Sequence, residues 1–253
     1  MPATAIIPAR LGSTRFPRKA LADETGRPMV VHVCERAALA ESVERVVVAT
    51  DAEEIAGAVR SHGFEAVLTG EHDNGTSRVG EAAERLGLSR LALVVNVQGD
   101  EPEIAPDVID AAVGVVRSWS GPGESVIGTV AAPFGADEDA SDPNIVKVVT
   151  THASAGVGGR RALYFSRSLI PHRRADGAGS APLKHVGLYC YTVGSLERFR
   201  GLAPTPLSRC EQLEQLRWLE HGLPIAVAVR KAAHHGIDTP GQYGEFVKRW
   251  RGS

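Results

Sequence analysis

The chain has 253 residues, 43% of them hydrophobic, and its 28 lysines and arginines nearly balance its 30 aspartates and glutamates. The formal net charge of −2 provides no overall attraction for nucleic acid or for an anionic membrane surface, so basic residues matter only where they cluster. The three cysteines, Cys34, Cys190 and Cys210, are widely spaced, which argues against a disulfide framework or a zinc site and favours a reducing compartment.

The apolar segments are all short, and none approaches the roughly 18 residues of a membrane-spanning helix. The first residues contain no charged segment before a long apolar stretch, so we expect no secretory signal. We therefore predict a soluble, cytoplasmic protein that binds neither nucleic acid nor membrane.

Strand and helix patterns alternate through the first part of the chain. The expected strands are residues 5–7, 45–50, 65–68 and 91–97. The expected helices are residues 30–38, 52–62, one that follows residue 78, and 106–119. This alternation predicts a parallel, doubly wound sheet with right-handed crossovers, as in Rossmann-like α/β proteins.

Strands outnumber helices in the second part. We expect strands near 126–131, 145–149, 162–167, 184–191 and 224–229, a helix over 211–221, and a final helix after Pro240. A basic, glycine-rich stretch at 172–181 interrupts this pattern. The prediction is a single α/β domain spanning 1–253, with a mostly parallel sheet and a smaller mixed α+β excursion at approximately 150–200.

The loop after the first strand is densely basic. It carries four cations and no acidic residue before Asp23: Arg10, Arg15, Arg18 and Lys19. Loops at the carboxyl ends of strands bind ligands in open α/β sheets, and a dense positive loop suits a polyanion such as a triphosphate. A solvated basic turn is the alternative. The Walker pattern of phosphate-binding loops is absent.

Two further loops follow expected strands. The polar loop 69–78 leads into a helix, where backbone N–H groups could hold a base or a phosphate, although an ordinary surface loop fits equally well. Asp100 follows a strongly apolar strand beside Gly99, which suits a divalent cation. A helix-capping role is the alternative for Asp100.

Several motifs occur in the order found in one enzyme family. The first group is Ile6-Ile7-Pro8-Ala9-Arg10, Ser13-Thr14-Arg15 with Lys19, Ala49-Thr50-Asp51, Gly75-Thr76 with Arg78, and Asn96-Val97-Gln98-Gly99-Asp100-Glu101-Pro102. The second group is Ala162-Leu163-Tyr164-Phe165-Ser166-Arg167, His185-Val186-Gly187-Leu188-Tyr189, Glu211 with Leu213-Glu214-Gln215-Leu216-Arg217, and Gly236-Ile237-Asp238-Thr239-Pro240. Over nearly its whole length the chain resembles the 3-deoxy-manno-octulosonate cytidylyltransferases, also called CMP-KDO synthetases.

The resemblance implies a reaction in which CTP and a sugar acid give a CMP-linked sugar acid and pyrophosphate. It implies that Lys19, Arg10 and Arg15 hold the triphosphate, and that Asp100 and Asp238 hold Mg²⁺. The implied nucleotide site contains Pro8, Ala9, Arg10, Leu11, Gly12, Ser13, Lys19, Gly75, Thr76, Arg78, Gln98 and Gly99. The chemistry is in-line displacement at the α-phosphorus, and no residue stands out as a general base.

The implied acceptor site consists of Arg167, His185, Tyr189, Glu214 and Gln215. A guanidinium such as that of Arg167 suits an acceptor carboxylate. His185 and Tyr189 lie four positions apart on an expected strand and therefore share one face. The family also implies a homodimer.

Several features depart from the family pattern. Arg18 stands where the family has glycine, Ser208 stands where it has glutamate, and the segment between Pro171 and His185 is short. These changes lie on the phosphate or acceptor side. They keep open a second acceptor class, a small phosphonate such as phosphonoformate. A non-catalytic CTP-binding module and a sialic acid cytidylyltransferase also remain open at this point.

Overall fold

The computed structural model describes residues 2–13, 15–119, 125–152, 159–172, 174, 181–232 and 236–252. The contacts divide the chain into two compact units. Unit 1 is Met1–Asp110 with His234–Ser253, and unit 2 is Ala111–Ala233. The element order confirms the expected α/β class, whereas the single domain with an excursion near 150–200 stays a prediction.

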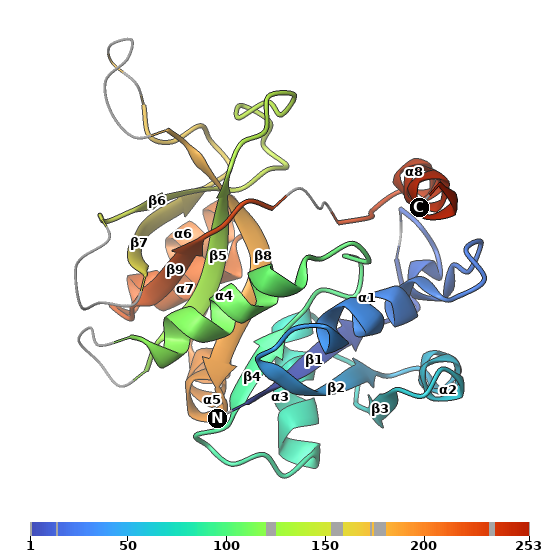
Figure 1. Cartoon of the computed structure of the whole chain (residues 1–253). Helices are drawn as coiled ribbons and strands as arrows, with labels where there is room; N and C mark the ends of the chain where they lie inside the picture. The colour runs from blue at the N-terminus through green and yellow to red at the C-terminus, as the bar shows by residue number, and fades with distance from the viewer. Residues whose placement is uncertain are drawn as a thin grey trace. The chain divides into compact units, whose positions relative to one another are not determined.

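Unit 1 contains a parallel sheet in the order β3-β2-β1-β4 (Figure 1). Its strands are β1 (Ala3–Ala9), β2 (Val43–Thr50), β3 (Glu65–Leu68) and β4 (Leu93–Asn96). Apolar runs rich in β-branched residues form β1, the end of β2 and β4, which are buried because both faces of a parallel sheet are covered. The edge strand β3 is short and partly exposed. Ile6 in β1 pairs with Val47 on one side and with Asn96 on the other.

The chain runs from β1 to β2 and β3 on one side of β1, and then places β4 on the other side. The strand order thus reverses between β1 and β4, and open α/β sheets bind ligands at the carboxyl ends of strands next to such a point. Pro8 and Ala9 end β1, and Gln98 follows β4 after Val97.

The helices of unit 1 are α1 (Met29–Ala38), α2 (Glu53–Ser61), α3 (Gly75–Arg85) and α8 (Pro240–Arg251), with a short 3-10 turn at Lys19–Leu21. The sequence interpretation extended the polar loop to Arg78, and this boundary was wrong. The helix begins at Gly75, because the side chain of Asn74 accepts the Ser77 N–H at 2.8 Å and caps the first turn.

Helix α8 brings the end of the chain to the first loop. Its buried Tyr243 and Phe246 pack with Met29 and Ile237, and Phe16 packs against this cluster. The Tyr243 hydroxyl accepts the Glu24 N–H at 2.9 Å. A capping box at Thr239 and Gln242 starts the helix, so the residue before it, Asp238, has a defined position.

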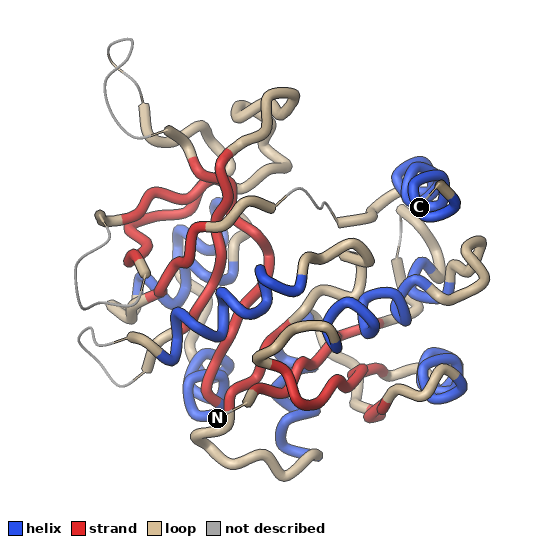
Figure 2. Tube along the Cα trace, viewed as in Figure 1, coloured by secondary structure: helices blue, strands red, loops and turns tan. Residues whose placement is uncertain are grey.

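Unit 2 contains a mixed sheet in the order β8-β5-β9-β7-β6 (Figure 1), and among its described strands only β5 and β9 pair in parallel. Figure 2 draws these strands in red. Its strands are β5 (Ile127–Pro133), β6 (Lys147–Thr150), β7 (Arg160–Ser166), β8 (Leu183–Thr192) and β9 (Ile225–Val229). Because β6 also pairs with β8, the strands close on themselves. Helix α4 (Pro106–Arg117) contains the boundary between the units.

The remaining helices differ from the sequence expectation. They are α5 (Val193–Gly201), α6 (Pro206–Glu211) and α7 (Glu214–Glu220). The expected single helix over 211–221 was wrong, because Gln212 adopts a left-handed conformation with φ 52 that ends α6. Helix α5 was not expected at all. Most of the basic, glycine-rich stretch 172–181 lies outside the described residues.

Within the described ranges, every helix is too short or too polar to cross a bilayer. All three cysteines are free thiols; Cys34 and Cys190 are buried and Cys210 is exposed.

Candidate functional site

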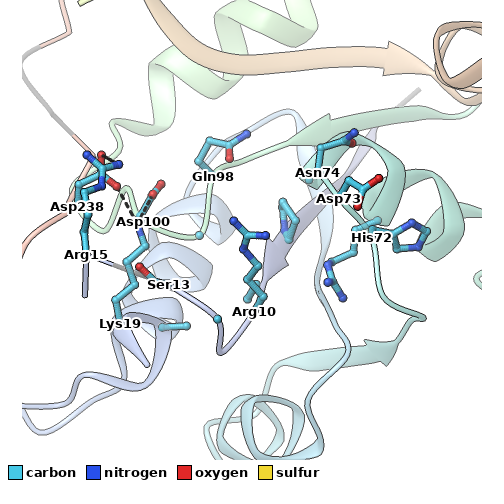
Figure 3. A pocket seen from close by; sticks show the side chains of 17 residues that line it. Arg10, Ser13, Arg15, Lys19, His72, Asp73, Asn74, Gln98, Asp100 and Asp238 are labelled. Atoms are coloured by element: carbon cyan, nitrogen blue, oxygen red, sulfur yellow. Dashed lines mark hydrogen bonds and ion pairs between the residues drawn. The ribbon is translucent and has the colours of Figure 1, made fainter. Parts of the chain in front are cut away.

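A cavity of about 310 Å³ lies in unit 1 at the carboxyl ends of β1 and β4. Its walls are formed by Pro8, Ala9, Arg10, Gly12, Ser13, Arg15, Lys19, Ala20, His72, Asp73, Asn74, Gly75, Arg78, Gln98, Gly99, Asp100 and Asp238. Figure 3 shows one end with Arg15, Lys19, Asp100 and Asp238. It shows His72, Asp73 and Asn74 at the other end, with Arg10 and Gln98 between.

Lys19 is the centre of the charged end. Its ammonium donates to Asp100 Oδ2 at 2.6 Å, to Asp238 Oδ1 at 3.1 Å and to the Ile237 carbonyl at 3.0 Å. Arg15 pairs with the other oxygen of Asp238 at 2.9 Å. The backbone reinforces this group, because the Ile237 N–H donates to the Asp100 carbonyl at 2.8 Å. Residues from three distant parts of the chain thereby form one ion-pair cluster.

Gly99 allows the two strand ends to approach closely. A Cβ atom at this residue would lie 2.8 Å from the Pro8 carbonyl oxygen, a separation that real Cβ atoms essentially never show. At Gly75 a Cβ would lie 3.2 Å from Pro8 Cγ. Glycine at both positions therefore permits the close approach of Pro8.

Arg18, one of the departures from the family pattern, has a left-handed backbone with φ 58. Glycine adopts this conformation without steric cost, which explains why a glycine suits the position. The Arg18 guanidinium pairs with Glu54, and Arg18 is absent from the cavity wall. The positive charge of Arg18 is thus paired outside the cavity.

The other end of the cavity is built on α3. Arg78 is almost fully buried, and it donates to Asp51 Oδ2 at 2.6 Å and to Thr69 Oγ1 at 2.7 Å. These contacts fix the first turn of α3 to the ends of β2 and β3. His72, which lines this end of the cavity, contacts Glu81, which does not line it. Burial raises the pKa of Glu81, but hydrogen bonds from His72, the Gly70 N–H and Arg85 outweigh this effect and lower it.

The structure brings most of the expected nucleotide residues into one wall, together with both expected metal ligands. Leu11 and Thr76 are not part of it. The sequence interpretation missed His72, Asp73, Asn74 and Ala20. Asparagine is a common N-cap residue, so its place before Gly75 could have indicated that Asn74 begins a helix at the cavity wall. The binding roles of all these residues stay predictions.

The two carboxylates at the charged end suit Mg²⁺ by their chemistry. Mg²⁺ in nucleotide sites is held by one or two carboxylates together with phosphate oxygens and water. Asp100 and Asp238 are partly exposed, at 28% and 43% of their side chains, so they are accessible from the cavity. No cluster of three or more metal-ligating side chains occurs among the described residues, so the phosphates would have to complete such a site.

Unit 2 contains the expected acceptor residues. His185 and Tyr189 of β8 have ring centroids 5.4 Å apart, which confirms that they share a face, and Phe165 packs edge-on against His185 at 5.0 Å. Burial lowers the pKa of His185 to about 3. Burial, and then Tyr191 and Glu214, raise the pKa of Tyr189 well above its usual range.

The tautomer of His185 follows from its partner. The Thr129 hydroxyl donates to the Leu188 carbonyl at 2.7 Å, so towards His185 Nε2, 2.9 Å away, it can only accept. The imidazole therefore carries its hydrogen on Nε2, and the lone pair of Nδ1 is an acceptor.

Arg167 lies at the end of β7 and is tied to Glu211 of α6. The backbone N–H of Arg167 donates to Glu211 Oε2 at 2.8 Å, and its guanidinium Nε donates to the Glu211 carbonyl at 2.8 Å. The Ser166 hydroxyl donates to Glu211 Oε1 at 2.6 Å. The fully buried ammonium of Lys147 donates to the Arg167 carbonyl. The backbone of Arg167 is thus held firmly in place. Two of its guanidinium nitrogens already donate to main-chain carbonyls, those of Glu211 and Pro143.

The last two acceptor candidates lie side by side on α7. Glu214 is exposed, whereas Gln215 is 6% exposed and belongs to the core side of the helix. His185 and Tyr189 are therefore grouped, and Arg167 is anchored. Gln215 is far less exposed to solvent than Glu214.

A family model described as cytidylyltransferase matches residues 4–227. A 3-deoxy-manno-octulosonate cytidylyltransferase from Leptothrix cholodnii is 49% identical, and the match covers 94% of this chain and 87% of that protein. A protein with the same name from Anaeromyxobacter sp. (strain K) is 49% identical over 93% of this chain and 92% of its own.

Two solved structures resemble this chain. One is a CMP:2-keto-3-deoxy-manno-octonic acid synthetase complexed with CTP, with a TM-score of 0.88, 34% identity, and coverage of 100% of this chain and 99% of that one. The other is a cytidylyltransferase from Leptospira borgpetersenii with a TM-score of 0.55 and 16% identity, covering 98% of this chain and 85% of that one, which supports the fold alone.

Proposed function

Because this chain belongs to the family of 3-deoxy-manno-octulosonate cytidylyltransferases, we propose that it transfers CMP from CTP to 3-deoxy-manno-octulosonate and releases pyrophosphate. The observation that carries the proposal is a cavity that combines phosphate-binding cations with two carboxylates. The names of the similar proteins favour this acceptor over a phosphonate.

In the proposed reaction, a hydroxyl oxygen of the sugar acid attacks the α-phosphorus of CTP. The bond from that phosphorus to the bridging oxygen breaks, pyrophosphate leaves, and the hydroxyl proton passes to solvent. Such a reaction needs positioning and charge stabilisation more than covalent help from the protein. Arg10, Arg15 and Lys19 would neutralise the triphosphate and stabilise the charge that develops on pyrophosphate.

Mg²⁺, held by Asp100 and Asp238 with phosphate oxygens, would supply further neutralisation of that charge. The first turn of α3, fixed by Arg78, offers backbone N–H groups to the nucleoside or a phosphate. Gln98 adds a side-chain amide close to the same wall.

We propose that side chains of unit 2 bind the sugar acid. Arg167 would pair with the carboxylate of the sugar acid, and the neutral His185 would accept a hydrogen bond from a hydroxyl. Tyr189, Glu214 and Gln215 would bind further hydroxyls. We also propose that the enzyme acts in the cytoplasm, in keeping with its three free cysteines.

We propose a homodimer as well. Three large leucines of unit 2 are exposed, namely Leu163 at 52%, Leu169 at 49% and Leu207 at 41%. Exposed apolar side chains form interfaces between subunits where they lie in one contiguous patch. Light scattering after size-exclusion chromatography would give twice the mass of one chain, and a mass of 26.8 kDa would reject the dimer.

The test of the function is pyrophosphate release from CTP with a panel of sugar acids and phosphonates. We expect release only when 3-deoxy-manno-octulosonate or a close analogue is present. Release with phosphonates alone would replace the acceptor, and release with none would favour a CTP-binding module. In that assay Asp100→Ala should abolish turnover, and unchanged turnover would remove Asp100 from the metal site.

A further inference from the structure

The ion-pair cluster of unit 1 places a cation between the two carboxylates proposed for the metal. The Lys19 ammonium lies 2.6 Å from Asp100 Oδ2 and 3.1 Å from Asp238 Oδ1. An ammonium has three N–H donors, and the Ile237 carbonyl takes the third at 3.0 Å. All the donors of Lys19 are thereby used within this cluster, and none remains for a phosphate.

The fold itself brings the two carboxylates together. Asp100 follows β4, and Asp238 precedes α8, whose position depends on packing against Met29 and Phe16. Both acids bind the same nitrogen, so their oxygens are close enough to repel each other unless a cation lies between them. Lys19 supplies that cation.

We infer that Lys19 competes with a divalent cation for Asp100 and Asp238, so that the triphosphate opens the cation site by drawing the ammonium away. This inference rests on the proposed function, because it takes these acids as the metal ligands. A unit charge and a divalent ion this close to the same oxygens repel each other strongly even when partly exposed. The metal and CTP should therefore bind cooperatively, each favouring the arrangement that the other requires.

The cavity offers a matched control for this role. Arg10 also lines the cavity, but within the described part of the chain its guanidinium forms no ion pair. Removing Arg10 therefore takes one positive charge from the same cavity without freeing either carboxylate. Among the described residues Arg15 pairs only with Asp238, so its removal should have an intermediate effect.

The experiment measures Mn²⁺ binding to the full chain without nucleotide, by electron paramagnetic resonance of the free ion. Lys19→Met should bind Mn²⁺ roughly tenfold more tightly than the wild type, because the competing charge is gone. Arg10→Met should remain close to the wild type. Adding Asp100→Asn to Lys19→Met should remove the gain and so locate it at the two acids.

Lys19→Gln provides a second variant if Lys19→Met does not fold, as judged by circular dichroism and thermal unfolding. Equal or weaker Mn²⁺ binding by a folded Lys19 variant would overturn the inference. So would an equal gain in Arg10→Met, or a gain that survives Asp100→Asn.

The two proposals fail separately. If the wild type makes a CMP-linked sugar acid while the Lys19 variants gain no Mn²⁺ affinity, the competition is wrong and the function stands. If the wild type shows no transfer, the proposed function fails whatever the Mn²⁺ result.

Discussion

The close approach of β1 and β4 at Gly99 makes a sharp prediction for Gly99→Ala. The added Cβ would lie 2.8 Å from the Pro8 carbonyl oxygen, and its next neighbours would be Ile7 Cγ2 at 3.5 Å and Ala9 Cβ at 3.8 Å. The clash is with main chain that pairs with β2, so no flexible side chain can move to relieve it. One strand end must shift by a few tenths of an ångström.

The magnitude follows from two opposing effects. Overpacking of this kind costs about 1–3 kcal/mol. Alanine restricts the unfolded chain more than glycine does, which returns about 0.4–1 kcal/mol. The net expectation for Gly99→Ala is a loss of roughly 1–2 kcal/mol in the free energy of unfolding, measured by urea denaturation. Affinity for CTP should fall as well, because Pro8 and Ala9 line the cavity.

Gly12→Ala is the control. Gly12 also lines the cavity, but a Cβ there would have nothing within 4 Å. Its free energy of unfolding should stay within about 0.5 kcal/mol of the wild type. If Gly99→Ala were as stable as Gly12→Ala, the close approach of the two strand ends would be refuted.

Three further predictions concern pH, backbone conformation and thiols. His185 is partly buried, and its pKa of about 3 lies below the 6.5 of the unfolded chain, so its contribution to stability should be lost as pH falls, at about 1.4 kcal/mol per pH unit between 6.5 and 3. Urea titrations should show a weaker pH dependence for His185→Gln, and equal slopes would contradict the lowered pKa of this ring. Arg18→Gly should raise Tm, because glycine relieves a left-handed backbone while the lost exposed pair with Glu54 contributes little; a lower Tm in calorimetry would count against that conformation. A maleimide should modify Cys210 first, since burial raises the pKa of Cys190 to about 12 and raises that of Cys34 further, and mass spectrometry that finds the label on Cys34 in folded protein would contradict the structure.

The sequence was informative where local pattern decides the structure. Runs such as Val46–Val48 predicted the parallel strands, and the alternation of elements predicted the α/β class, because periodicity and crossover geometry permit few arrangements. The charged loop from Arg10 to Lys19 was visible for the same reason, since four cations after a strand are a local signal.

Some features depended on contacts that no local pattern contains. Asp100 and Asp238 were paired only through the family resemblance, since it is the packing of α8 that joins them. The break between α6 and α7 at Gln212 also escaped, because glutamine normally continues a helix and only its φ shows otherwise. The burial of Arg78 behind Asp51 could not be read from a loop that looked exposed.

The central claim is CMP transfer from CTP to a sugar acid, and phosphorus NMR of the product tests it most directly. With CTP, Mg²⁺ and 3-deoxy-manno-octulosonate, we predict that the α-phosphorus signal of CTP converts to that of a phosphodiester while free pyrophosphate appears in equal amount. If CTP persisted with this sugar acid, or if it gave pyrophosphate and free CMP without a phosphodiester, the proposed activity would be contradicted.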